Sequence, residues 1–303
     1  MTKAVITGPT GVIGTALVRR LLAAGVEVYA VCRPQSPRVS HLPHDACLHN
    51  VECDLHELAR LPELVPQPCQ MFFHLGWLGT SQRANRFAMH LQVANIDCAL
   101  AAAESAIQLG VQVFVGAGSQ AEYGLVADGV LRPDTPTHPI SGYGMAKLCA
   151  GQMTRLLCQQ AGVRHIWVRP LSIYGPSDGA QTLIAAAIET LQAGRHFAMT
   201  AGEQMWDYLY AADAAEAFYQ LALQGRDGGI YPLGSGQARP LREYVEIIRR
   251  LVAPKAAIGF GERPYLPDQV MHMEADIASL TADTGWQPQT SFAEGIRSML
   301  AQS

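Results

Sequence analysis

Residues 3–14 read KAVITGPTGVIG, an apolar run that leads directly into a glycine-rich turn. The run at 3–7 is short, β-prone and bounded by glycine, which predicts a buried strand of a parallel sheet. A helical pattern at 15–24 and a second apolar run at 26–32 follow. This order of strand, glycine turn, helix and strand is the setting in which glycines at this spacing predict a dinucleotide site.

The glycine turn has a physical reason to hold a pyrophosphate. Backbone N–H groups at a helix N-terminus attract the anion, and glycine lets the chain approach it closely. The glycine pattern alone is a weak signal, and the alternative is a tight strand-to-helix turn with no ligand. Its position after the first strand favours the site, with contacts expected from Gly8, Thr10, Gly11, Val12, Ile13 and Gly14.

The end of the second predicted strand bears on the choice of dinucleotide. An acidic residue there would bond the ribose 2′-hydroxyl of NAD, whereas this chain has Arg33, which can pair with the 2′-phosphate of NADP. The alternative is an arginine in a solvated loop. We therefore expect NADP(H) as the favoured cofactor, with NAD(H) possible.

Further apolar segments complete an α/β fold with a Rossmann-type doubly wound parallel sheet. They lie at 51–55, 70–75, 112–116 and 163–169, with long helical patterns at 86–110 and 142–161. After residue 170 the elements become short and alternate less strictly. We expect residues 1–170 to form the NAD(P)-binding domain. Residues 171–303 are predicted to form mainly a smaller α/β substrate-binding domain, with some segments returning to the sheet.

In doubly wound sheets, ligands bind along the carboxyl ends of the strands. Asp54 and Leu55 are predicted to close the third strand, with Asp54 meeting an adenine edge. Leu75, Gly76 and Trp77 follow the fourth strand, and Trp77 is interpreted equally well as a wall of the cofactor cleft or as core.

Composition excludes several other classes. The 303 residues carry a net charge of −4, which marks neither a nucleic-acid nor an anionic-membrane partner. We find no apolar run of signal-peptide or membrane-span length, so a cytoplasmic protein is expected. The seven cysteines form no C-x-x-C pair and are expected to be reduced and mostly buried. The histidines show no metal-ligand spacing.

Tyr143 and Lys147 lie four residues apart in the predicted helix 142–161. Four residues are about one helical turn, so a phenol and an amine share one face. Together with the upstream hydroxyl of Ser119 they form a group suited to proton transfer. Tyr-x-x-x-Lys alone is more often a surface pair, but the glycine turn and Ser119 favour catalysis.

At this point nearly the whole chain resembles the extended short-chain dehydrogenase/reductases, the NAD(P)-dependent nucleotide-sugar epimerase/dehydratase family. The residues that carry the resemblance are Thr7-Gly8-x-x-Gly11-x-x-Gly14, Phe73-His74-Leu75-Gly76, Asn95, Ser119 before Tyr123-Gly124, Tyr143-x-x-x-Lys147, Arg169-Pro170 with Tyr174-Gly175-Pro176, Asp207-Tyr208-Leu209-Tyr210 through Asp213, and Gly285-Trp286-x-Pro288.

The resemblance implies a role for each matching residue. Tyr143 is the general acid/base, Lys147 bonds the nicotinamide ribose and Ser119 holds the substrate oxygen. Asn95, Pro170 and Ser172 are also expected to bind the cofactor. We expect the substrate to contact Trp77, Ser119, Gln120, Tyr143, Ser172, Trp206 and Arg263, of which Trp77 and Trp206 depart from the family pattern. The resemblance also implies a homodimer built from the helices at 86–110 and 142–161.

One departure from the family pattern argues against one of the reactions that the family catalyses. Sugar-nucleotide 4,6-dehydratases carry an Asp-Glu pair after the catalytic hydroxyl, where this chain has Gln120 and Ala121. Neither can do acid/base work, so dehydration is disfavoured. Glu122 is one place further on and is expected to point to the other face. What remains is 4-keto reduction or 4-epimerisation of a nucleotide sugar, and Arg33 favours reduction.

A second departure concerns the substrate. Family members often have an arginine that reaches the nucleotide phosphates where this chain has Trp206, which cannot pair with a phosphate. Arg263 lies near another such place, with a loose local match. Relatives also often have a small residue in place of Trp77. An NADPH-dependent reductase of a non-nucleotide carbonyl compound therefore stays open, as does a non-catalytic dinucleotide sensor.

Overall fold

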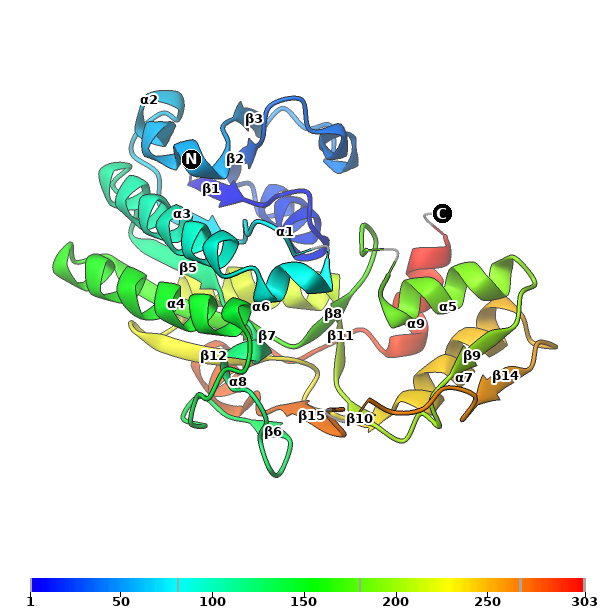
Figure 1. The fold of residues 1–303 in the computed structure, drawn as a ribbon. Coiled ribbons are helices and arrows are strands. Elements are labelled where there is room, and N and C mark those ends of the chain that lie inside the picture. Colours follow the sequence, from blue (N-terminus) through cyan, green and yellow to red (C-terminus); the bar gives the residue numbers. More distant parts are fainter. Residues whose placement is uncertain (1, 81, 180, 267–268, 302–303) are drawn as a thin grey trace.

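The computed structural model describes residues 2–80, 82–179, 181–266 and 269–301. A seven-stranded sheet lies at its centre in the order β12-β7-β5-β4-β1-β2-β3, with all neighbouring strands parallel. The strands are β1 Lys3–Thr7, β2 Glu27–Cys32, β3 Leu48–Glu52, β4 Met71–His74, β5 Val113–Ala117, β7 Arg164–Pro170 and β12 Gly229–Leu233. The predicted doubly wound parallel sheet is thus confirmed (Figure 1).

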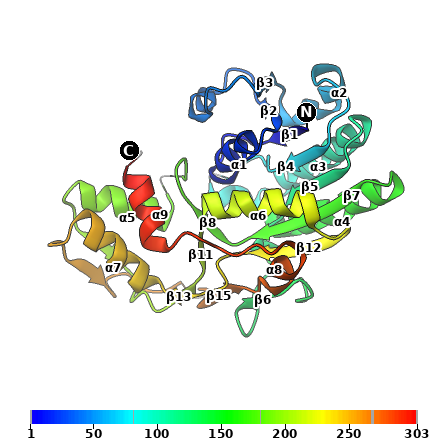
Figure 2. The same cartoon turned by 180° about the vertical axis from the view of Figure 1, so that it is seen from behind.

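Helices cover both faces of this sheet. On one face lie α3 (Met89–Gln108) and α4 (Gly142–Gln160), as Figure 1 shows, and on the other lie α1 (Val12–Ala23) and α6 (Ala211–Gln224), as seen from behind in Figure 2. Each face buries its own apolar core. The inner strands β1, β4 and β5 are near-continuous apolar runs because both of their faces are covered.

Two sequence predictions of element bounds were wrong. The third strand ends at Glu52, and Asp54 instead caps a 3-10 turn, η2 (Leu55–Arg60), by accepting a hydrogen bond from the backbone N–H of His56 at 3.0 Å. Asp side chains favour such caps because they accept hydrogen bonds from nearby backbone N–H groups. The predicted helix 86–110 is likewise shorter, because a 3-10 turn, η3 (Arg83–Phe87), precedes α3.

Most of the remaining elements form a second, smaller group beyond the carboxyl end of β1 (Figure 1). Its core lies among α5 (Leu183–Gln192), α7 (Leu241–Val252) and α9 (Phe292–Leu300), beside the paired strands β9 (Phe197–Met199) and β14 (Ile258–Phe260). A four-stranded sheet, β13-β10-β15-β6, borders this group. Its strands are β6 Val130–Leu131, β10 Met205–Trp206, β13 Arg239–Pro240 and β15 His272–Ala275, and α8 (Ala278–Thr284) follows β15.

The segment 171–176, directly after the predicted strand 163–169, contains a further strand. β8 (Ser172–Tyr174) pairs in parallel with β11 (Tyr208–Tyr210), so the chain leaving β7 continues alongside the substrate half. The partner lies more than thirty residues away, and a three-residue strand has no local periodicity that would reveal it.

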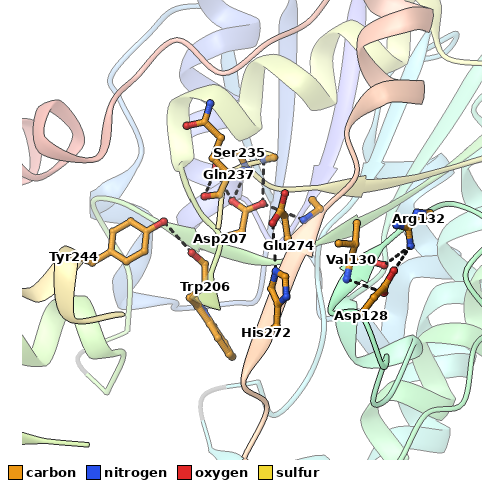
Figure 3. A network of polar contacts seen from close by, with 12 residues as sticks. Asp128, Val130, Arg132, Trp206, Asp207, Ser235, Gln237, Tyr244, His272 and Glu274 are labelled. Atoms are coloured by element: carbon orange, nitrogen blue, oxygen red, sulfur yellow. Dashed lines mark hydrogen bonds and ion pairs between the residues drawn. The ribbon is translucent and has the colours of Figure 1, made fainter. Parts of the chain in front are cut away.

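Asp207 fixes the position of β10 and β11 relative to the main sheet. Its buried carboxylate accepts hydrogen bonds from the backbone and hydroxyl of Ser235 at 2.6 Å each, from the Gly236 N–H at 3.0 Å and from the Ala275 N–H at 3.1 Å (Figure 3). The Tyr244 hydroxyl donates to the carbonyl of Trp206. The backbone that carries Trp206 is therefore held from both sides.

All seven cysteines are free thiols, and five of them are buried. Burial raises the pKa of Cys32, Cys69 and Cys98 to about 11. These thiols are protonated and unreactive at neutral pH. Within the described ranges, no helix is long and apolar enough to cross a membrane, and no cluster of three or more His, Cys, Asp or Glu side chains could hold a metal ion.

Candidate active site

The turn between β1 and α1 contains three glycines, Gly8, Gly11 and Gly14, which differ in the space around them. Gly8 has a φ of +69°, and a Cβ there would lie 2.8 Å from the Gly76 nitrogen, while a Cβ on Gly14 would collide with the Gly8 carbonyl oxygen. At Gly11, a Cβ would meet only the Gly8 oxygen among the described residues, at 3.6 Å. Packing thus requires glycine at 8 and 14, whereas Gly11 leaves the start of α1 open to a ligand.

The helix that follows fits an anionic ligand. Gly11 caps α1 without a side-chain hydrogen bond, and no acidic residue lies in its first turn. The first N–H groups of a helix have no partner within the helix, and they carry the positive end of its dipole. The residues of this turn therefore fit the pyrophosphate of a dinucleotide.

Nine residues predicted for the cofactor do not line the cavity in front of Tyr143: Gly8, Thr10, Gly11, Gly14, Arg33, Asp54, Leu55, Gly76 and Asn95. Arg33 follows β2, where it is exposed and forms no ion pair with any described residue. Asp54 caps η2, and the Leu55 side chain approaches Gly76 so closely that a Cβ there would lie 2.8 Å from it. The side chains of Arg33, Asp54 and Leu55 are therefore not part of the wall in front of Tyr143.

A cavity of about 660 Å³ lies at the carboxyl ends of the strands. It brings most of the other predicted residues together, although they come from distant parts of the chain. Its walls include Val12, Ile13, Leu75, Trp77, Ser119, Gln120, Tyr143, Lys147, Pro170, Ser172 and Trp206.

The predicted proton-transfer group faces this cavity. Ser141 caps α4 by accepting from the Gly144 N–H at 3.2 Å, which places Tyr143 in the first turn and Lys147 one turn later. The Ser119 hydroxyl hydrogen-bonds to the Tyr143 phenol. The buried Lys147 ammonium donates to the carbonyl oxygen of Ala117, at the end of β5, at 2.7 Å.

Burial dominates the electrostatics of this group. It raises the pKa of the Tyr143 phenol above its ordinary value, while the Ser119 hydrogen bond and the charge of Arg86 act in the opposite direction. Burial also lowers the pKa of Lys147 to about 7, and the carboxylate of Glu122 opposes this shift. At neutral pH the phenol is therefore protonated and available to donate a proton, while the amine of Lys147 is close to the midpoint of its titration.

Sequence reasoning missed Arg86. Its guanidinium lies 5.3 Å from the centre of the Tyr143 ring and lines the cavity, and the Lys147 ammonium lies 6.0 Å from the same ring. Arg86 belongs to η3, and the two residues are 57 positions apart. No local pattern links them, so only the packing of η3 against α4 could reveal the contact.

Glu122 points away from the cavity, as predicted, but for a different reason. Ser119 and Glu122 form the capping box of a 3-10 turn, η4 (Gln120–Glu122), instead of a strand end. The fully buried carboxylate accepts from the Ser119 N–H at 2.8 Å, from Trp167 Nε1 at 3.0 Å and from Arg169 Nε at 2.6 Å. Gln120 and Ala121 remain in the cavity wall, so its described lining carries no acidic side chain.

Asn95 supports the segment that follows β4. Its side-chain oxygen accepts from the Leu78 N–H at 2.7 Å, and its amide donates to the carbonyls of Leu78 and Leu91 at 3.1 Å each. The buried amide is fully used by backbone groups and does not line the cavity. Asn95 therefore stabilises the chain beside Trp77 instead of facing the space in front of Tyr143.

A second cavity of about 730 Å³ adjoins the first within the smaller group of elements. Ser172 and Trp206 line both cavities, and the Trp206 indole N–H donates to the Ser172 hydroxyl at 2.7 Å. The second cavity also contains Arg263, which does not reach the first. Trp206 thus stands at the junction, and Arg263 lies on its far side.

The amino-acid sequence is similar to a known protein family and to individual enzymes. Residues 4–234 match the model of the NAD dependent epimerase/dehydratase family. UDP-glucose 4-epimerase of Mycolicibacterium smegmatis is 26% identical over 97% of this chain and 96% of its own length. GDP-6-deoxy-D-mannose reductase of Pseudomonas aeruginosa is 26% identical over 63% of this chain and 65% of its own length.

The fold is shared with solved structures. The crystal structure of UDP-glucose 4-epimerase from Thermotoga maritima with UDP-glucose superimposes with a TM-score of 0.87, covering 99% of this chain and 98% of that one at 21% identity. The family match spans most of the chain and includes the glycine turn and the group formed by Ser119, Tyr143 and Lys147. This protein belongs to the NAD(P)-dependent epimerase/dehydratase family.

Proposed function

We propose that the protein catalyses oxidation or reduction at a single carbon of a nucleotide sugar, either 4-keto reduction or 4-epimerisation. The observation that carries the proposal is the hydrogen-bonded pair of Ser119 and Tyr143, with Lys147 one turn away, in the cavity that also contains the first turn of α1. A bound nicotinamide would supply or accept the hydride at this site.

The chain's own residues handle the proton. In the reductive direction, Ser119 orients the substrate oxygen and Tyr143 donates its proton to it. In the oxidative direction, the phenol must first lose its proton, which burial opposes. Positive charge near the ring lowers this cost, and Arg86 supplies it from within the chain.

Arg86 is expected to set the pH dependence of the reduction. Reduction requires the protonated phenol, so activity falls as pH rises through the Tyr143 pKa. Arg86→Gln removes a charge that lowers this pKa, so the alkaline limb of the kcat profile should move to higher pH. Arg86→Lys keeps the charge and should leave the limb nearly in place. An alkaline limb that does not move in Arg86→Gln would rule out this role.

Dehydration is not part of the proposal. It requires a proton to be removed at C5 and a hydroxyl to be protonated at C6. Gln120 and Ala121 follow Ser119 in the cavity wall and can do neither, while Glu122 is buried against Trp167 and Arg169. The chain thus retains groups for one redox step at C4 only.

We propose NADP(H) as the preferred cofactor, because Arg33 lies exposed at the end of β2 and is free to bond a 2′-phosphate. Arg33→Ser should weaken NADPH binding by about 10- to 100-fold, the value of charge-assisted hydrogen bonds, and leave NADH binding unchanged. Arg38→Ser, in the exposed 3-10 turn η1 (Pro37–His41), is the matched control. Equal losses for both dinucleotides in Arg33→Ser would contradict the assignment.

The dinucleotide that copurifies with the protein distinguishes the two reactions. An epimerase regenerates its cofactor within each turnover and can retain it, whereas a reductase must exchange it. Tightly held NAD, identified by absorbance and mass, would favour epimerisation. A protein that purifies without nucleotide and prefers NADPH would favour reduction.

The adjoining cavities support a two-part substrate. The sugar would occupy the first cavity beside Tyr143, and the nucleotide would extend past Trp206 towards Arg263 in the second. Trp206 itself supports a second candidate, a non-nucleotide carbonyl compound, because an indole at the junction offers no charge to a diphosphate. NADPH consumption with a panel of 4-keto nucleotide sugars beside simple ketones and aldehydes ranks the two. Turnover of the simple carbonyls alone would reject the nucleotide-sugar proposal.

We also propose a homodimer built from α3 and α4, whose outer faces expose Met89, Val93, Met145 and Leu156. Leu156→Glu would bury a charge in the interface and should give a monomer by light scattering. Leu223→Glu, on α6 at the opposite face, is the control and should not change the molar mass. A monomeric unmodified protein would refute the dimer.

A further inference from the structure

Trp77 lies directly against the Lys147 side chain. The Lys147 ammonium is 3.7 Å from the centre of the indole ring, and the Tyr143 ring meets the same indole edge-on, with the ring centres 6.1 Å apart. Trp77 is 8% exposed and Lys147 is 3% exposed, so little water separates them. Trp77 follows β4 and Lys147 lies in α4, which makes this a contact between two elements.

A buried amide holds the indole in place. Trp77 Nε1 donates to the side-chain oxygen of Gln92 at 3.0 Å, and the Gln92 amide donates to the Asn85 carbonyl at 2.8 Å. Gln92 is 3% exposed, and both ends of its amide are used. Because the Gln92 amide is held by Asn85, its hydrogen bond to Trp77 holds the indole ring in one orientation. The same contact ties η3, which carries Arg86, to the indole.

Lys147 has few other partners. Its ammonium carries three N–H donors, and the carbonyl oxygen of Ala117 accepts one of them. Glu122 acts on it through charge alone, because that carboxylate is bonded to Trp167 and Arg169. After the Ala117 carbonyl oxygen at 2.7 Å, the negative face of the indole at 3.7 Å is the next compensation for the buried positive charge.

We infer that Trp77, oriented by Gln92, is a positioning residue that holds the Lys147 ammonium over its indole face and directs it into the catalytic cavity. The side chain of Lys147 has four rotatable bonds, so its direction depends on what surrounds it. The indole limits it on one side and the Ala117 carbonyl limits it on the other. This inference depends on the proposed function only for its kinetic readout.

Lysine NMR tests the geometry without any substrate. The chain has three lysines, Lys3, Lys147 and Lys255, so ¹³Cε-labelled lysine gives few signals, assigned with Lys3→Arg and Lys255→Arg. Protons above an aromatic face are shielded, so the Lys147 ε-protons should appear upfield of the other two. Trp77→Leu should abolish this shift, and Gln92→Leu should reduce it because the ring loses its orientation.

Steady-state kinetics test whether the contact between Trp77 and Lys147 affects turnover. Trp77→Leu should lower kcat by about 10- to 100-fold, as expected when a reacting group is displaced by roughly 1 Å, with a smaller change in the KM for the carbonyl substrate. Trp77→Phe retains an aromatic face and should recover most of the activity. Trp286→Leu is the matched control, because Trp286 is equally buried but lies outside both cavities, bonded to the Asp213 carbonyl. It should lose stability but not kcat.

Two results would overturn the inference. One is a Lys147 signal without an upfield shift in the unmodified protein, and the other is a folded Trp77→Leu variant with unchanged kcat. If Trp77→Leu does not fold, Gln92→Leu replaces it: this variant frees the indole, so both the upfield shift and kcat should fall, and a folded Gln92→Leu variant with neither change would overturn the inference. An upfield signal in a protein that turns over no nucleotide sugar would instead contradict the proposed function and support the contact.

Discussion

Tyr143→Phe is expected to lower turnover by about 10²- to 10⁴-fold, the usual contribution of a general acid/base. The substitution removes the hydroxyl that bonds to Ser119 and keeps the ring that packs against Trp77 and beneath Arg86. The glycine turn is untouched, so dinucleotide affinity should stay within about twofold. Single-turnover kinetics and dinucleotide titration measure the two quantities separately.

The matched control is Tyr219→Phe. Tyr219 lies on α6 against Arg20, outside both cavities, and should tolerate the loss of its hydroxyl with unchanged turnover. If Tyr143→Phe retained full activity, another group would have to carry the proton. If it lost dinucleotide binding as well, Tyr143 would act mainly in binding, not in proton transfer.

Glu122→Gln is expected to destabilise the protein by about 3–5 kcal/mol, the cost of leaving a buried charge without its partner. The variant keeps the shape of the side chain but removes the negative charge beside Arg169, and both residues are buried. Equilibrium unfolding in denaturant measures the change in free energy. Activity should also fall, because the same carboxylate holds the Ser119 backbone.

Glu57→Gln is the control for this prediction. Glu57 forms an exposed ion pair with Arg60, and such pairs contribute about 0–1 kcal/mol. Adding Arg169→Met to Glu122→Gln should recover part of the loss, because the unpaired guanidinium is then removed. A loss below about 1 kcal/mol in Glu122→Gln alone would show that the buried pair does not stabilise this region.

The features that could be predicted from the sequence are those that depend on local patterns of residues. The glycine turn, the apolar strands and the spacing of Tyr143 and Lys147 depend on neighbours a few residues apart, and the parallel sheet follows from their order. Asp54 shows the limit at short range. Its residue type is compatible with both a strand end and a cap, and in the structure its side chain accepts from the His56 N–H as a cap.

Long-range contacts account for what the sequence did not predict. Nothing in the local sequence distinguishes Glu122 from other acidic residues, because its partner Arg169 lies 47 positions later. Gln92 and Trp77 have no motif in common, and neither do Arg86 and Tyr143. In the smaller group, strands of two or three residues pair with distant partners, as Trp206 does with Arg239 and Met273. Too few residues are involved for periodicity to appear.

We propose that the protein changes one carbon of a nucleotide sugar by hydride transfer, with Tyr143 as the proton donor or acceptor. The most direct measurement is NMR of the products formed from a panel of nucleotide sugars and 4-keto nucleotide sugars, with NADPH deuterated at the transferable position. We expect a product altered only at C4. It carries the deuterium if the enzyme is a reductase, is inverted at C4 without deuterium if the enzyme is an epimerase, and does not form with Tyr143→Phe. A product that has lost water across C5 and C6, or turnover confined to simple carbonyl compounds, would contradict the proposal.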